Sequence, residues 1–149
     1  MAIIFGNSTN NTLNGFFSND SLYGQAGDDS LYGQAGDDIL YGQDGKDNLR
    51  GGGGADVLKG GNHSDKLFGN AGNDSLYGQA GKDNLRGGDG HDVLKGGNHS
   101  DKLFGNAGND SLYGQAGDDI LYGQAGKDNL SGGGGADVLK GGNHSDKLF

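Results

Sequence analysis

Leucine recurs at every ninth residue from Leu13 to Leu148, and polar or turn-forming residues fill most of the positions between. A glycine recurs with the same spacing, so residues 6–149 divide into sixteen nonapeptides without a gap. The unit GQAGDDILY at residues 33–41 returns unchanged at residues 114–122. A period this strict indicates a repeat architecture rather than an irregular globular core.

Each nonapeptide predicts a turn followed by a short strand. Its first six letters are rich in Gly, Asn and Asp, which tolerate positive φ and tight reversals. Its last three letters alternate around Leu, so Leu should face inward and its two neighbours outward. Two turns and two three-residue strands then form one coil, and the sixteen repeats form about eight coils spaced about 4.8 Å apart. We expect an all-β solenoid without helix, because glycine at this density disfavours helix.

The two ends of the chain differ from each other. We interpret residues 1–23 as an N-terminal cap with degenerate first repeats, followed by regular repeats over residues 24–149 of the same single domain. The first two repeats carry Thr9 and Ser18 at the fourth place, where most others carry glycine. Solenoids need covered ends, and no comparable C-terminal cap is visible. End-to-end self-association through the uncapped C-terminal coil is therefore a prediction.

The amino-acid composition and the net charge exclude several kinds of site and partner. The chain has no cysteine, which excludes disulfides and thiolate metal sites. Its net charge of −9 argues against a nucleic-acid partner, because phosphate binding requires a basic surface. No apolar run approaches the roughly 20 residues of a membrane span. All 20 acidic residues are aspartate, and most of them occupy the sixth place of a repeat. The acidic residues therefore occupy a fixed place in the repeat and are not scattered along the chain.

The aspartate column poses an electrostatic problem for the predicted coil. Stacking should place Asp29 near Asp47 and Asp38 near Asp56, and carboxylates about 5 Å apart repel by roughly 3 kcal/mol at an effective dielectric of 20. One buried Leu per repeat supplies only about 2 kcal/mol, whereas ordering nine residues costs on the order of 10 kcal/mol. A cation between the turns is therefore expected. Carboxylate and carbonyl oxygens suit Ca²⁺ better than Mg²⁺ or Zn²⁺.

The pattern GGxGxDxLx resembles the calcium-binding nonapeptide of the RTX (repeats-in-toxin) family. Clear matches are GQAGDDSLY at residues 24–32, GGGGADVLK at 51–59 and 132–140, and GGDGHDVLK at 87–95. The resemblance implies a right-handed parallel β-roll with two nonapeptides per coil. It also implies a secreted, extracellular protein that folds when calcium ions bind between stacked turns on both edges.

Carried over to this sequence, the family pattern makes the sixth-place aspartates the metal ligands. Seven gaps between the turns of each edge would admit up to about fourteen calcium ions. The first gap on each edge is less regular, because Asn11 replaces aspartate in the first repeat, on one edge, and the turn of the second repeat, on the other edge, is unusual. The expected ligands are Asp20, Asp29, Asp38, Asp47, Asp56, Asp65, Asp74, Asp83, Asp92, Asp101, Asp110, Asp119, Asp128, Asp137 and Asp146.

Three turns of sequence GGNHSD place His63, His99 and His144 at the fourth place. If that place requires positive φ, histidine adopts it with some strain, and these turns should bind calcium more weakly. A zinc site is the alternative interpretation of the histidines, but zinc needs convergent ligands. We favour solvated turn residues.

Aromatic and basic residues recur at the ninth place, which should face outward. A binding strip for sugars or a partner is one interpretation, and we favour the other, a cross-strand ladder. On one face Arg50, Phe68, Arg86 and Phe104 should alternate in cation–π contact. The lysines of the strand faces are interpreted as solvated charges that discourage edge aggregation.

These observations favour a calcium-binding repeat module that is not an enzyme and that serves as a structural, secretion-associated or designed element. The alternative is a surface-binding β-roll, adhesive or ice-binding. Ice-binding faces should carry ranks of threonine, and this chain has only Thr9 and Thr12. No nucleophile, base and orienting residue stand in a pattern typical of catalysis.

Overall fold

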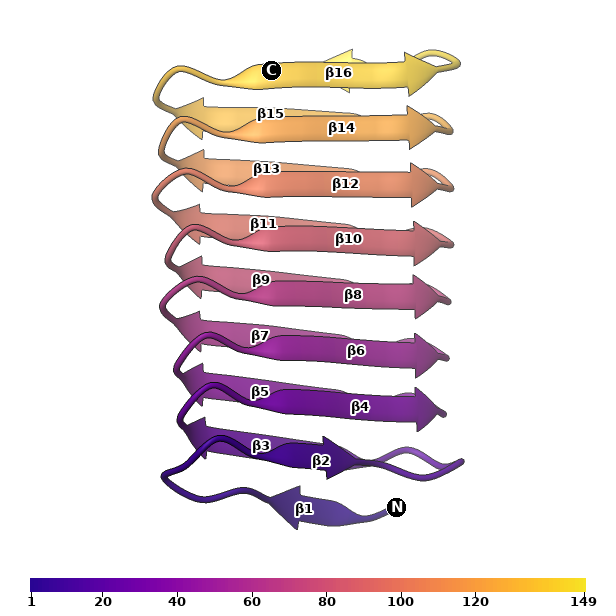
Figure 1. The fold of residues 1–149 in the computed structure, drawn as a ribbon. Helices are drawn as coiled ribbons and strands as arrows, with labels where there is room; N and C mark the ends of the chain where they lie inside the picture. Colours follow the sequence, from indigo (N-terminus) through magenta and orange to yellow (C-terminus); the bar gives the residue numbers. More distant parts are fainter.

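The computed structural model describes all 149 residues and contains seventeen β-strands and no helix. Figure 1 shows two facing sheets whose strands stack in order from the N-terminal end to the C-terminal end. No helix is present that is long and apolar enough to cross a membrane. The strands are β1 (Ile3–Phe5), β2 (Thr12–Asn14), β3 (Ser21–Ala26), β4 (Ser30–Ala35), β5 (Ile39–Asp44), β6 (Asn48–Gly53), β7 (Val57–Asn62), β8 (Lys66–Ala71), β9 (Ser75–Ala80), β10 (Asn84–Asp89), β11 (Val93–Asn98), β12 (Lys102–Ala107), β13 (Ser111–Ala116), β14 (Ile120–Ala125), β15 (Asn129–Gly134), β16 (Val138–Asn143) and β17 (Lys147–Leu148).

The odd-numbered strands form a nine-stranded sheet and the even-numbered strands an eight-stranded sheet. Every strand pair is parallel, and each residue pairs with the residue eighteen positions further along, as Leu22 does with Leu40 and Leu31 with Leu49. One coil therefore contains two nonapeptides. The predicted all-β parallel solenoid of about eight coils is confirmed.

The core is one cluster of leucines between the two sheets, to which each sheet contributes a column. Thirteen eighth-place leucines, from Leu22 to Leu130, have no exposed surface. Ile4, Leu13 and Leu139 pack against them at the two ends and are partly buried. Each strand thus contributes one large apolar side chain, as the alternation of the sequence predicts.

The strands are longer than the sequence predicts. Most have six residues instead of three, because pairing continues through the first three places of the next repeat. In β5 the residue at the second place, Gln43, has φ 79° and is still paired with Gln25 and Gly61 on either side. Six-residue pairing gives the backbone polar groups of the glycine-rich segment partners that a free turn would lack. Treating that whole segment as a turn was wrong.

The outward ladder is confirmed. Arg50 pairs in register with Phe68, and Arg86 lies between Phe68 and Phe104. The guanidinium carbons of Arg50 and Arg86 lie 5.1 and 5.5 Å from the ring centres of Phe68 and Phe104. Cations and rings therefore cover one another from strand to strand along the solenoid axis, as cation–π contact requires.

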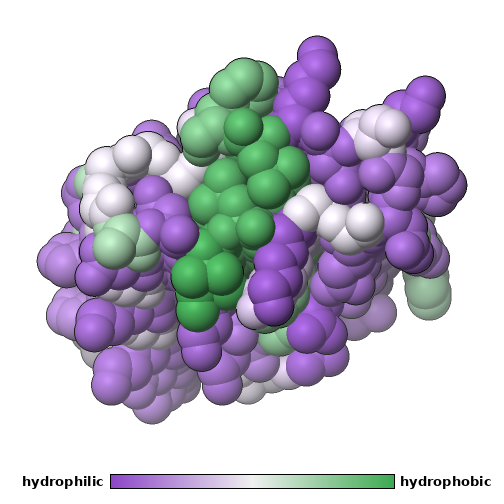
Figure 2. Space-filling view, turned by 90° about the horizontal axis from the view of Figure 1, so that it is seen from above, coloured by the Kyte–Doolittle hydropathy of each residue, from purple (hydrophilic) through white to green (hydrophobic).

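The end coils are the least regular part of the fold. Strands β1 and β2 have three residues each, and Phe17 is 91% exposed. The division at residue 23 stays a prediction. Figure 2 shows an apolar band across the end that carries the C-terminal coil, where Val138, Leu148 and Phe149 are exposed.

Candidate metal centres

The sixth-place residues of alternate repeats stack into two columns, one along each edge of the solenoid. The turn between β3 and β4 carries Asp29, and the turn of the next coil on that edge carries Asp47. The backbone N–H of each member donates to the side-chain Oδ1 of the member one coil further along, at 2.7–2.9 Å. One column contains Asn11, Asp29, Asp47, Asp65, Asp83, Asp101, Asp119 and Asp137; the other contains Asp20, Asp38, Asp56, Asp74, Asp92, Asp110, Asp128 and Asp146.

These bonds confirm the stacking that the period predicts. Asp29 donates to Asp47 and Asp38 donates to Asp56, each at 2.8 Å. Seven bonds in each column give fourteen links between adjacent turns. Fourteen is also the number of gaps that the sequence provides for ions.

The second carboxylate oxygen has no partner in the interior of both columns. Buried polar groups are nearly always hydrogen-bonded, and each unsatisfied one costs about 1–3 kcal/mol, more when charged. A row of such oxygens at a regular spacing is therefore a feature that needs a chemical explanation. The buried Oδ2 atoms without a hydrogen bond are those of Asp29, Asp38, Asp47, Asp56, Asp65, Asp74, Asp83, Asp92, Asp101, Asp110, Asp119 and Asp128.

Each of these oxygens points toward the first-place glycine of its own repeat. A Cβ atom added to Gly33 would collide with Asp38 Oδ2 and would lie 2.6 Å from the carbonyl oxygen of Gly51. The carboxylate therefore occupies the space that a side chain at the first place would need. Sequence reasoning assigned this glycine to turn geometry only. The signal that was available is the joint recurrence of Gly at place one and Asp at place six.

The first two repeats satisfy the same oxygen internally. Asp20 Oδ2 accepts a hydrogen bond from the N–H of Phe16 at 2.7 Å, and Asn11 Oδ1 accepts one from Asn7 at 2.7 Å. The hydrogen bond from Phe16 is the main cause that holds the pKa of Asp20 below its usual value. Repeats one and two therefore differ chemically from those that follow.

Burial raises the pKa of the interior carboxyls. The pKa of Asp65 rises to about 8 and that of Asp74 to about 7, from a usual value of 3.8. Burial is the main cause, the hydrogen bond from the stacked backbone N–H opposes it, and the charges of the neighbouring aspartates add to it. Burial therefore favours the protonated form of these two carboxyls unless a cation balances their charge.

Backbone carbonyls supply further oxygens in the same turns. The fourth-place residues have positive φ, for example 113° at Gly36 and 126° at Gly54. A Cβ atom added to Gly54 would collide with the carbonyl oxygen of Gly36, one coil before it. No backbone N–H donates to these fourth-place carbonyls. Each gap between turns is thus bordered by carboxylate and carbonyl oxygens.

The histidine turns adopt the same backbone as the glycine turns. His63 and His99 have φ 77° and His144 has φ 78°, in the left-handed region that strains a non-glycine residue. Nowhere do three or more His or Asp side chains converge on one point. Side chains alone therefore do not form a metal site, and an ion at these turns requires carbonyl oxygens as well.

Comparison with protein families agrees with this geometry. No curated protein matches the chain. The family model described as the RTX calcium-binding nonapeptide repeat matches residues 3–31, 23–58, 41–73, 59–94, 95–130 and 122–149. These matches together span nearly the whole chain, which therefore belongs to the RTX calcium-binding nonapeptide repeat family.

Proposed function

We propose that this chain is a calcium-dependent folding module that forms its β-roll when Ca²⁺ binds between stacked turns. The observation that carries the proposal is the twelve buried Oδ2 atoms without a partner. Each lies in a column where the next carboxylate is one coil away. A divalent cation would supply the missing charge and coordination there.

The donor set fits calcium. The oxygens come from aspartates and from fourth-place carbonyls, and no cysteine exists in the chain. Calcium takes 6–8 oxygen ligands with flexible geometry, whereas magnesium requires a tight octahedron and keeps several waters. The histidines stand on separate turns and do not provide the convergent nitrogen ligands that zinc prefers.

The fifteen sixth-place aspartates are the proposed ligands, with up to about fourteen ions. Asp20 is the weakest candidate, because both of its oxygens already accept backbone hydrogen bonds. Asp137 and Asp146, in the last coil, are only partly buried. The interior gaps between Asp29 and Asp128 are therefore expected to bind most strongly.

Far-UV circular dichroism during a calcium titration tests the coupling of folding to binding, with magnesium as the control. We expect a steep change from coil to β with calcium only, because each ion bridges two turns. A β spectrum that persists unchanged in excess chelator would refute calcium-dependent folding.

A matched pair of substitutions tests the ligand assignment. Asp74→Asn keeps the Oδ1 acceptor for Asp56 but removes the charge from the buried oxygen. Asp89→Asn removes an equal charge from an exposed position in β10. Equilibrium dialysis should show that Asp74→Asn binds one or two ions fewer, whereas Asp89→Asn binds the normal number. Equal losses in the two variants would contradict the assignment.

The role proposed for the folded module is structural and secretion-associated rather than catalytic. The RTX repeat family is a non-catalytic structural module, and the fully buried apolar side chains between the sheets are all leucines. The family resemblance favours an extracellular location. Extracellular calcium would then keep the module folded after export.

Association of two copies end to end is part of this proposal. Strands β1 and β17 are the edges of the nine-stranded sheet. Apolar side chains are exposed at both ends, with Ile3 and Phe5 at one and Phe149 at the other. Sedimentation velocity of the calcium-loaded chain should show dimers that Phe149→Ser reduces. A monomer at all concentrations would contradict it.

A further inference from the structure

The outer face of the eight-stranded sheet carries a stripe of cations, which we call the basic stripe: Arg50, Lys66, Arg86 and Lys102. Strands β6, β8, β10 and β12 each supply one of them, alternately from the ninth and the seventh place of the repeat. All four side chains are exposed. Neighbouring strands lie about 4.8 Å apart, so the stripe presents one positive charge per coil along the solenoid axis.

No carboxylate neutralises the basic stripe. The only ion pair within 4.0 Å in the whole chain joins the N-terminal ammonium to Asp20. Asp89, the last residue of β10, is the only acidic residue in the even-numbered strands. The negative charge of this acidic protein is thus confined almost entirely to the two turn edges, and the sheet face between them is positive.

A hollow adjoins the stripe at Arg50. It has a volume of about 180 Å³ and is lined by Tyr32, Gln34, Arg50 and Asn70. It exists because the next two residues after Arg50 are glycines without side chains. A guanidinium, two amides and a phenol beside one another match a ligand that carries both an anionic group and hydroxyls.

We propose that the basic stripe binds a linear acidic polysaccharide that runs along the solenoid axis. One sugar ring advances such a chain by about the strand spacing, so a polymer with one sulfate or carboxylate per sugar would place one anion opposite each cation. This inference needs the folded roll but no particular calcium site.

The ladder geometry disfavours a single-stranded nucleic acid as the ligand. Bases bind such proteins by stacking on free aromatic faces. Here the rings of Phe68 and Phe104 are covered by guanidiniums, and Phe104 also stacks on Tyr122 at 5.4 Å. The rings therefore hold the cations in position and are not available to bases.

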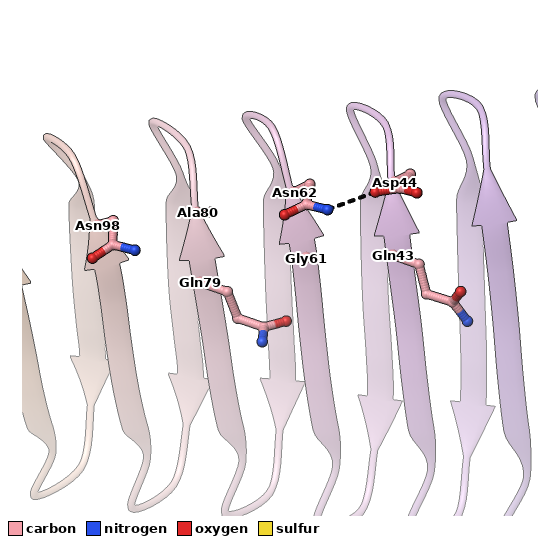
Figure 3. Close-up of a pocket in the computed structure, with 7 residues that line it drawn as sticks. All are labelled: Gln43, Asp44, Gly61, Asn62, Gln79, Ala80 and Asn98. Atoms are coloured by element: carbon pink, nitrogen blue, oxygen red, sulfur yellow. Dashed lines mark hydrogen bonds between the residues drawn. The ribbon is translucent and has the colours of Figure 1, made fainter.

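The opposite sheet provides an internal comparison. Its ladder cations, Lys59 and Lys95, are only partly exposed and lie between tyrosine rings. Figure 3 shows the polar groove of that sheet, where Gln43 and Gln79 flank Gly61 and the amide of Asn62 donates to Asp44. That groove contains no cation, so the basic stripe has no equivalent there.

Immobilised chondroitin sulfate, with about one anion per sugar, is the probe. Binding is measured by surface plasmon resonance in calcium, after circular dichroism has confirmed the β spectrum of each sample, so that a failure to fold and a failure to bind are distinguished. The test variant combines Arg50→Gln, Lys66→Gln, Arg86→Gln and Lys102→Gln. The control variant removes the same charge elsewhere by Lys46→Gln, Lys59→Gln, Lys95→Gln and Lys127→Gln.

We expect the test variant to bind at least about tenfold more weakly at 0.1 M ionic strength, and the control variant to stay within about threefold of the unaltered chain. Hyaluronan, with one carboxylate per two sugars, should bind more weakly than chondroitin sulfate, and dextran should not bind. Equal losses in the two variants, no binding by the unaltered chain, or tighter binding of oligo(dT) than of chondroitin sulfate would overturn the proposal. If the test variant does not fold, the single substitutions Arg50→Gln and Lys66→Gln are compared with Lys59→Gln, and a loss no larger than that of Lys59→Gln overturns it equally.

Discussion

Replacing the first-place glycine Gly69 by alanine should destabilise the roll through the carboxylate of its own repeat. The added Cβ would collide with Asp74 Oδ2 and would lie 2.7 Å from the carbonyl oxygen of Gly87, and both groups are held by the stacked coils. The φ of Gly69 is not positive, so backbone strain does not contribute. The substitution therefore acts only through a steric clash beside Asp74, the proposed ligand.

The expected size follows from overpacking in a close-packed interior, which costs about 1–3 kcal/mol. The carboxylate must move away from the added methyl group, while the Gly87 carbonyl on the other side is fixed in the sheet, so we expect a value near about 2 kcal/mol. Urea unfolding at saturating calcium, followed by circular dichroism, measures this loss. Displacement of Asp74 should also remove one or two bound ions in equilibrium dialysis.

Gly53→Ala is the matched control. A Cβ on Gly53 would have no heavy atom within 4 Å, and the φ of Gly53 is not positive. The corresponding place in β8 already holds an alanine, Ala71, which pairs with Gly53. We expect no loss of stability. If Gly69→Ala were as harmless as Gly53→Ala, the Asp74 carboxylate would not occupy the space described here, and the steric link between glycine and ligand would be refuted.

Three further outcomes are expected. Leu76→Ala, at a position without exposed surface, should lower the free energy of unfolding by about 2–5 kcal/mol in the same urea experiment. A loss smaller than that of Ile39→Ala, at a position that is 37% exposed, would contradict the leucine core. His63→Gly should raise the free energy of unfolding by up to about 1 kcal/mol, because φ 77° strains histidine. A lower free energy of unfolding in the variant would show that the histidine side chain contributes more than the strain costs. In excess chelator, the raised pKa values of Asp65 and Asp74 mean that the folded state binds more protons than the unfolded state. The folded fraction of the metal-free chain should therefore be greatest below about pH 4 and fall as the pH rises through about 7–8. A β signal in far-UV circular dichroism that is present at pH 5 and no weaker at pH 8.5 would contradict this sign.

Much of the fold could be predicted because the period of the sequence is the period of the structure. The place of Leu in every repeat determined the core, and the eighteen-residue coil determined which residues stack, so Asp29 was expected beside Asp47 and Arg50 beside Phe68. These contacts lie between residues a fixed number of positions apart. No long-range folding choice had to be inferred from composition.

The conformation of the first three places of each repeat could not be predicted in the same way. Glycine and glutamine at these places are typical of turns, yet Gln43 and Gln79 lie in strands with φ 79° and 81°. A single residue at positive φ between two extended neighbours keeps the strand paired and still redirects its backbone. Local conformational propensity does not predict this paired conformation, because it depends on a neighbouring coil that has a positive-φ residue at the paired position.

The Oδ2 atoms without a hydrogen-bond partner could likewise not be predicted from the sequence. The first two repeats show which structural feature leaves these oxygens without a partner. Asp20 Oδ2 is satisfied by the N–H of Phe16, and neither Phe16 nor the equivalent Asn7 has positive φ. From Gln25 onward the second place has positive φ and is paired with the neighbouring strands, and no N–H donates to the Oδ2 of the interior aspartates. The Oδ2 of the sixth-place aspartate therefore has a hydrogen-bond partner in one kind of turn and none in the other, according to one backbone angle four residues before it. Under the proposed calcium dependence, the aspartate, which both kinds of turn contain, determines a site less than the second-place residue that turns its amide away.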